Sequence, residues 1–297
     1  MPDPGSPRVV PGGVLDGPTG GRSGGAGGAG LDDREPGLGR LFFVVGAFDG
    51  LHRGHTYLLG RLRTAAAAHR AQPAVITFDH HPDEILVGKA PPVLCDPSER
   101  LVRFGRAGVD VVVVQHFDAA IRLTPYTDFV AAVGRRFELA GFLMTPDAAF
   151  GHERRGTPQA LAELGRSQRF VVDVVEPLDV DGRPVRSTEI RADIAAGRLG
   201  SARRLLGRSV AVVGRVVGRS GETPLRVSFE LPVALPPAGR YRVDLERAWA
   251  PDVPRHESPV RALAEITAGG ELRLEPIGRA MPPAADRLRI RFIGPVA

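Results

Sequence analysis

Short apolar runs alternate with longer amphipathic segments over residues 41–208, as expected for strands that alternate with helices. The apolar runs are rich in Val, Leu, Ile and Phe, and they lie at residues 41–45, 74–78, 109–114, 141–144 and 169–175. Helices are predicted over residues 53–70, from about 96 to 107, over 125–137, from 157, and over 187–196 and 201–206. Apolar strands separated by helices predict an α/β fold with a parallel sheet covered on both faces.

The pattern changes after residue 207, where prolines and glycines separate shorter strand candidates. These candidates lie at residues 210–217, 225–231, 241–245, 260–266, 271–274 and 288–292. Several of them alternate apolar and polar residues, which predicts a small antiparallel barrel or sandwich. Residues 1–40 are rich in Gly and Pro, so we expect a disordered extension, or equally a start site assigned too early. The predicted domains are therefore 1–40, 41–208 and 209–297.

The segment GAFDGLHRGH at residues 46–55 places two histidines, His52 and His55, between the first predicted strand and the first predicted helix. Backbone N–H groups and the positive end of a helix dipole converge at such a place, which suits a phosphate. The glycines allow the backbone to approach a ligand closely. Imidazole N–H groups add donors that strengthen as negative charge builds on a phosphate. A His-x-x-His pair alone is also typical of surface residues or of half a zinc site, but the surrounding residues favour a phosphate-binding turn.

Composition narrows the possible chemistry. Cys95 is the single cysteine, so an internal disulfide is excluded and a cysteine-based zinc site is not expected. Lys89 is the single lysine and no GxxxxGK[ST] segment is present, which excludes a P-loop. The net charge of +5 comes from scattered arginines that do not interleave with aromatics, so nucleic-acid binding is not predicted. No apolar run is long enough to span a membrane, and no secretory signal is seen, so we expect a cytoplasmic protein.

Several motifs in register resemble those of bacterial FAD synthetases, the bifunctional riboflavin kinase/FMN adenylyltransferases. The turn at 46–55 is similar to their G-x-F-D-G-x-H-x-G-H, a form of the HxGH nucleotidyltransferase signature. Residues 77–82, TFDHHP, resemble T-F-[DE]-P-H-P, with His80 where proline is usual. Residues 147–151, DAAFG, resemble [DN]-F-x-F-G, and residues 186–191, RSTEIR, resemble S-S-T-x-I-R. Residues 202–208, ARRLLGR, resemble the A-x-x-L-L-G-R hinge that leads into the family's kinase domain.

The resemblance implies a Rossmann-like HxGH nucleotidyltransferase domain that transfers AMP from ATP to FMN, giving FAD and pyrophosphate. It implies that His52 and His55 are catalytic and contact the ATP phosphates. The residues implied to bind nucleotide or phosphate are Gly46, Phe48, Asp49, Gly54, Ser187, Thr188 and Arg191. The residues implied to bind flavin are Phe78, Pro82, Asp147 and Phe150. Mg²⁺ is expected to arrive with ATP, and no protein metal ligand is predicted.

Two departures from the family pattern leave alternatives open. The barrel region lacks the family's G-F-P-T-A-N segment and reads RSGETPLRV at residues 219–227, so we predict that riboflavin kinase activity is absent. The first aromatic of the 147–151 motif is replaced by Ala148. The chain is therefore expected to be an FMN adenylyltransferase, with a nucleotidyltransferase for another phosphate acceptor or a non-catalytic flavin- or nucleotide-binding paralogue as alternatives. Its expected partners are the small molecules ATP and FMN, and the sequence does not indicate an oligomeric state.

Overall fold

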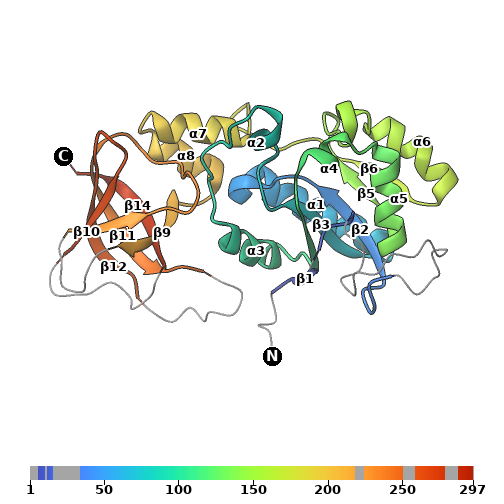
Figure 1. Cartoon of the computed structure of the whole chain (residues 1–297), viewed down its shortest axis with the longest axis horizontal. Helices are drawn as coiled ribbons and strands as arrows, with labels where there is room; N and C mark the ends of the chain where they lie inside the picture. The colour runs from blue at the N-terminus through green and yellow to red at the C-terminus, as the bar shows by residue number, and fades with distance from the viewer. Residues whose placement is uncertain are drawn as a thin grey trace.

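The computed structural model describes residues 6–10, 12–15, 34–217, 224–249, 258–277 and 287–296. They form an α/β part and a closed β-barrel, which lie on opposite sides of the view in Figure 1. The predicted α/β fold with a parallel sheet and a second antiparallel β part is therefore confirmed. No helix in the described ranges combines the length and the apolar character needed to cross a bilayer.

The α/β part is built on a sheet of parallel strands in the order β1-β4-β3-β2-β5-β6. The strands are β1 (Arg8–Val10), β2 (Arg40–Val45), β3 (Gln72–Phe78), β4 (Val111–Gln115), β5 (Glu138–Met144) and β6 (Val171–Val174). The chain first moves from β2 through β3 to β4, and then returns to the other side of β2 to form β5. The strand order thus reverses beside β2, and crevices at such switch points commonly bind ligands at the carboxyl ends of the strands.

Helices cover both faces of this sheet. They are α1 (Arg53–Ala68), α2 (Pro82–Leu86), α3 (Pro97–Arg106), α4 (Ala119–Leu123), α5 (Tyr126–Arg136) and α6 (Pro158–Gln168), with short 3-10 turns η2 (Asp49–Leu51) and η3 (His152–Arg154). Alternate residues of β2 supply the two cores, since Leu41 and Phe43 belong to one and Phe42 and Val44 to the other. Two of these helices begin with a capping side chain, because that of Asp96 accepts from the first turn of α3 and that of Thr157 from the first turn of α6.

The C-terminal part is a closed antiparallel barrel in the order β10-β13-β12-β11-β14-β9. Its strands are β9 (Ala211–Val217), β10 (Leu225–Ser228), β11 (Gly239–Arg247), β12 (Val260–Ile266), β13 (Leu272–Pro276) and β14 (Arg287–Pro295). A small hairpin of β7 (Asp179–Val180) and β8 (Arg183–Pro184) precedes helices α7 (Ser187–Ala195) and α8 (Leu199–Leu206). These helices lie against the barrel in Figure 1, and their buried residues Ile190, Ile194 and Leu205 share one apolar core with the barrel strands.

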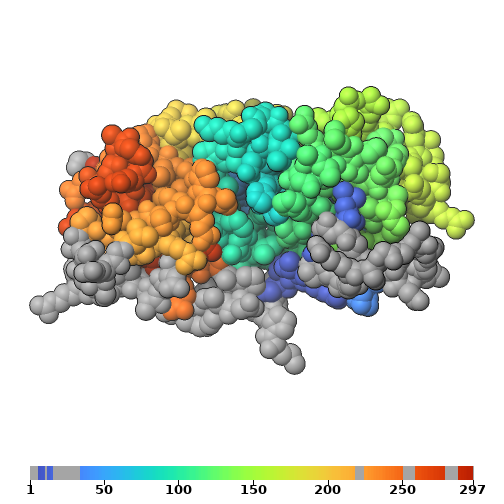
Figure 2. Space-filling view, in the orientation of Figure 1, coloured from blue at the N-terminus to red at the C-terminus, as the bar shows by residue number. Residues whose placement is uncertain are grey.

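The barrel and the α/β part are also joined by the segment between α2 and α3, which lies between them in Figure 2. Val93 forms a parallel bridge with Val233, donating its amide to Pro232 O and accepting from Ala234 N. Near the same junction, the guanidinium groups of Arg103, Arg106 and Arg289 lie over the ring of Trp249. The two parts are therefore connected by backbone pairing and side-chain packing as well as by the chain itself.

The N-terminal prediction needs correction, because part of the expected disordered extension is ordered. Arg8–Val10 forms the edge strand β1, paired in parallel with β4. Val10 and Val14 are buried, and Arg136 donates to the carbonyl oxygens of Gly12 and Gly13. The high Gly and Pro content of residues 1–40 masked these short apolar stretches. The first of them is recognisable as a strand only through its pairing with β4. The rest of the predicted extension, residues 1–5, 11 and 16–33, lies outside the described part of the chain.

Candidate functional site

The predicted phosphate-binding turn lies directly after β2, beside the switch point. Phe48 and Leu51 have positive φ angles of 51° and 36°, which non-glycine residues rarely adopt. Phe48 is buried, with its ring 5.4 Å from that of Phe104 and 5.1 Å from that of His55. A Cβ on Gly54 would lie 3.2 Å from the ring of His52 and 3.2 Å from the carbonyl oxygen of Val185, so the space at this position favours glycine. Backbone strain concentrated in one turn is common at functional sites.

The two histidines of this turn are stacked on each other, with ring centroids 3.7 Å apart and planes inclined by 16°. His52 is 4% exposed and caps α1, because its Nδ1 accepts a hydrogen bond from the amide of His55 at 3.3 Å. A neutral His52 ring therefore carries its proton on Nε2. The Nδ1 atom of His55 is buried and has no hydrogen-bond partner within the described part of the chain, which is uncommon for a buried polar atom.

Both rings are neutral at physiological pH. Burial lowers the pKa of His52 to about 4, and the nearby charges of Arg208 and Arg191 act in the same direction. Burial, followed by the effects of His52 and Arg208, lowers the pKa of His55 well below its usual value. The turn therefore offers neutral imidazole donors to a phosphate, with positive charge supplied by arginines.

Asp49 ties this turn to α7 and to the segment before α3. Its carboxylate accepts from the amide of Leu94 at 3.0 and 3.2 Å and forms an ion pair with Arg191 at 2.6 Å. Arg191 also donates from Nε to Pro92 O at 2.8 Å, and the hydroxyl of Ser187 donates to Asp49 O at 3.0 Å. The structure thus brings three predicted residues, Asp49, Ser187 and Arg191, into one hydrogen-bonded assembly.

The N-terminus of α7 borders this assembly. Arg186 is the N-cap residue and makes no side-chain capping bond, so the first amides of α7 lack a side-chain acceptor. The hydroxyl of Ser187 is used on Asp49, and Thr188 is exposed in the first turn. The hydroxyl of Ser187 therefore does not cap α7.

Two half-buried arginines that the sequence did not single out hold the backbone of the turn. Arg208 donates to the carbonyl oxygens of Gly50 and Leu51, the latter at 3.2 Å. Arg100 donates to Ala47 O at 2.9 Å and to Phe78 O at 2.7 Å. Burial, followed by repulsion from Arg103, lowers the pKa of Arg208 to about 10, so this group remains charged. Arg208 ends the A-x-x-L-L-G-R segment, which was the available signal, whereas the sequence around Arg100 carried none.

A largely apolar cavity of about 470 Å³ opens next to the turn. Three of the predicted flavin residues, Phe78, Pro82 and Phe150, line it together with Gly46 of the turn. Its remaining walls come from the carboxyl ends of several strands and the segments that follow them, and they include Phe117, Phe129, Arg122, Thr124, His152 and Arg154. Pockets of this size, apolar with a few polar groups, are typical of small-molecule sites.

Asp147 stands apart from the other predicted flavin residues. It does not line the cavity, its side chain is 69% exposed, and it pairs with Arg186 at 3.7 Å. Its carboxylate also accepts from the hydroxyl of Thr145 at 2.8 Å, while its carbonyl oxygen accepts from Arg154 at 3.1 Å. In this structure Asp147 therefore orders the loop that carries Phe150.

Two further predictions concern residues away from the turn. Cys95 is buried, and burial together with Glu99 raises the pKa of its thiol to about 12, so a nucleophilic thiolate is not available there. Residues 219–223, which stand where the family's kinase motif is missing, lie outside the described part of the chain. The predicted absence of kinase activity therefore stays a prediction.

Comparison with known proteins agrees with this geometry. A family model described as FAD synthetase matches residues 38–189. The bifunctional riboflavin kinase/FMN adenylyltransferase of Pseudomonas fluorescens is 31% identical over 175 residues, which are 59% of this chain and 56% of that protein. The protein of the same description from Escherichia coli K12 is 29% identical over 226 residues, 75% of this chain and 71% of that one. The chain thus spans little more than half the length of the Pseudomonas relative.

A solved structure extends the likeness to both parts of the fold. A protein described as a macrolide-efflux protein from Streptococcus pneumoniae superposes with a TM-score of 0.72, covering 90% of this chain and 88% of its own. At 21% sequence identity, this likeness shows a common fold and nothing about activity.

Proposed function

Since the chain belongs to the FAD synthetase family, we propose that it is an adenylyltransferase that transfers AMP from ATP to the phosphate of FMN. The products of this reaction are FAD and pyrophosphate. The observation that carries the proposal is the juxtaposition of two neutral, stacked imidazoles with an aromatic-lined cavity, both at the carboxyl ends of the strands beside the switch point. A triphosphate on the turn and an isoalloxazine ring in the cavity would occupy adjacent sites.

In this reaction an oxygen of the FMN phosphate attacks the α-phosphorus of ATP in line. The new P–O bond joins the two phosphates of FAD, and the bond between the α-phosphorus and the bridging oxygen breaks to release pyrophosphate. The attacking phosphate is already ionised at neutral pH, so no general base is needed. The protein therefore contributes positioning and stabilisation of negative charge rather than a covalent nucleophile.

The residues of the turn have distinct roles in this proposal. The Nε2–H of His52 and the ring of His55 donate hydrogen bonds to phosphoryl oxygens, and they do so best when charge accumulates in the transition state. Arg191 and the first amides of α7 face the leaving pyrophosphate. Arg208 and Arg100 act as positioning residues, because they hold the backbone carbonyls of the turn.

Mg²⁺ would enter with ATP and neutralise its phosphates. Asp49 of the turn is not needed as a metal ligand in this arrangement. Both of its carboxylate oxygens are already engaged by the Leu94 amide and by Arg191. We therefore assign the metal to the phosphate oxygens and to water, and we assign no ligand role to Asp49.

The decisive experiment incubates the purified chain with FMN, ATP and Mg²⁺ and follows FAD and pyrophosphate by chromatography. FAD formation supports the proposal. Turnover only with a different phosphate, such as a pantetheine or polyol phosphate, supports the alternative acceptor, and tight binding of FMN or ATP without turnover supports a non-catalytic paralogue. In a parallel incubation of riboflavin with ATP, we expect no FMN, in keeping with the altered segment at residues 219–227.

A further inference from the structure

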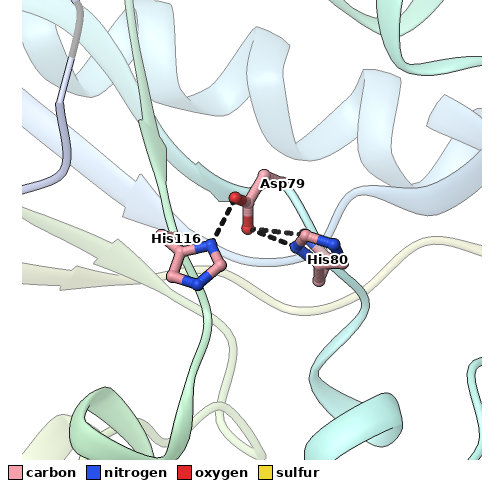
Figure 3. A group of neighbouring side chains, drawn as sticks. All are labelled: Asp79, His80 and His116. Atoms are coloured by element: carbon pink, nitrogen blue, oxygen red, sulfur yellow. Dashed lines mark hydrogen bonds and ion pairs between the residues drawn. The ribbon is translucent and has the colours of Figure 1, made fainter.

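Three side chains with metal-binding chemistry converge at the rim of the sheet, outside the turn. Figure 3 shows Asp79 between His80 and His116, with both rings directed at its carboxylate. Oδ2 of Asp79 lies 2.6 Å from Nδ1 of His116, and Oδ1 lies 3.1 Å from Nδ1 of His80. One potential ligand atom from each residue lies within 4.8 Å of the other two.

The sheet register explains why these residues meet. Phe78 of β3 pairs with Gln115 of β4 at the end of the ladder, so Asp79 and His116 are the next residues on neighbouring parallel strands. The backbone continues the link, because Asp79 N donates to Gln115 O at 3.2 Å. Oδ1 of Asp79 also accepts from the amides of His80 at 2.7 Å and Phe117 at 3.1 Å, and these bonds orient the carboxylate. Such outer contacts are what orient ligands in metal sites.

We propose that Asp79, His80 and His116 bind one divalent transition-metal ion, with Zn²⁺ as the best match. Two imidazole nitrogens and one carboxylate oxygen suit Zn²⁺ and its first-row neighbours, whereas Mg²⁺ and Ca²⁺ prefer oxygen ligands alone. Tetrahedral Zn²⁺ holds its ligand atoms about 3.3 Å apart, so small rotations of these side chains complete the set. Water fills the remaining position, as in zinc sites with three protein ligands.

The exposure of the three residues fits this assignment. The side chains of Asp79, His80 and His116 are 35%, 47% and 56% exposed, which gives an ion access from solvent and lets the rings turn. His80 stands where the family motif has proline, so the full ligand set is a property of this chain rather than of that motif.

The ion would act as a clamp on the cavity wall. It would connect the segment after β3 with the segment after β4, and each segment contributes an aromatic ring to the cavity. These rings, Phe78 and Phe117, meet edge to face with centroids 5.1 Å apart. Metal binding would therefore fix this aromatic pair and stabilise the folded state. This proposal stands independently of the adenylyltransferase proposal, because it concerns binding of the ion alone.

The test is a titration of the untagged, metal-free full chain with Zn²⁺ and with Co²⁺. We expect one equivalent of Zn²⁺ to bind at micromolar concentration and Co²⁺ to give the intense visible bands of a low-coordinate site. His80→Ala, His116→Ala and Asp79→Asn should each weaken binding by at least about tenfold. Asp79→Asn retains an oxygen acceptor for the two amides, so it removes ligand charge with little effect on the loop.

A matched control comes from His69, whose Nε2 lies 3.2 Å from Oδ2 of Asp173. Within the described ranges this pair has no third ligand close enough to complete a site, so His69→Gln should bind metal as the parent does. A rise in melting temperature with Zn²⁺ should appear in the parent and in His69→Gln, and disappear in His80→Ala. The proposal is overturned if the parent binds no Zn²⁺ at micromolar concentration, or if the three site variants bind it as tightly as the parent.

Discussion

The two pairs of histidines in this chain show how the environment decides what the same side chain does. His52 and His55 are stacked on each other, near arginines, and burial lowers the pKa of both. His80 and His116 are exposed, and each contacts the ionised carboxylate of Asp79. In our proposals the first pair supplies neutral donors to an anion, while the second forms a ligand set for a cation. The contrast teaches that neighbouring charge and burial, rather than residue type or spacing, separate the two chemistries.

The largest expected effect tests the first pair. His52→Ala and His55→Ala should each lower kcat for FAD formation by about 10²–10³, because each removes a donor used in the transition state. Circular dichroism and melting curves check that the fold survives. His69, a half-buried histidine away from the turn, provides the control, and His69→Gln should keep the parental kcat. Parental rates in both alanine variants would contradict the catalytic assignment.

The second prediction uses the pKa of His52. Because its folded-state value of about 4 lies below the unfolded value of 6.5, the unfolded chain binds more protons between these values. Stability should therefore be complete above about pH 6.5 and fall as the pH drops toward 4, by about 3 kcal/mol from this group. Urea unfolding at a series of pH values measures it. His52→Gln should flatten this part of the profile, and an unchanged profile would show that the ring is not buried as a neutral group.

The third prediction concerns the support of the turn. Arg191→Ala leaves the buried carboxylate of Asp49 with its Leu94 amide but without a counter-ion, so we expect about 2 kcal/mol of destabilisation. The KM for ATP should also rise, since the turn loses one of its two side-chain links to α7. Arg186→Ala is the matched control, because its ion pair with Asp147 is exposed on both sides and should be worth less than about 0.5 kcal/mol. Equal losses of stability in the two variants would contradict the expectation that the Asp49–Arg191 pair contributes more than the exposed Asp147–Arg186 pair.

The smallest expected effect belongs to the second pair. In the absence of metal, His80→Ala should change the free energy of unfolding by less than about 0.5 kcal/mol, because an exposed ion pair contributes little. Chemical denaturation in the presence of a chelator measures this value. A large loss without metal would mean that the histidine is structural by itself, and the contrast between the two pairs would then disappear.

The sequence predicted local features well because the relevant physics is local. Runs such as 41–45 and 74–78 became β2 and β3, and the caps Asp96 and Thr157 begin the helices predicted there. The turn at residues 46–55 was predictable for the same reason, because its glycines and histidines lie within ten residues of one another, while its role in phosphate binding stays a prediction.

Features that depend on contacts between distant segments were not predictable. Arg100 and Arg208 reach the turn from 53 and 157 residues away along the chain, to Ala47 and Leu51 respectively. His116 meets Asp79 only through the β3–β4 register, which no single motif encodes. The edge strand β1 was missed because three residues show no periodicity of their own. Asp147 matched a motif, but its side chain points to Arg186 instead of the cavity.

The core shared by the barrel and α7–α8 has a consequence for how this molecule can be altered. Ile190 and Ile194 lie on the same helix as Ser187 and Arg191, and they are buried with the barrel strands. The barrel therefore also supports the turn, because α7 carries Ser187 and Arg191, which contact Asp49. A deletion after Gly207 would remove the barrel residues that pack against α7, and it would also remove Arg208. Loss of the barrel should therefore weaken nucleotide binding in the α/β part.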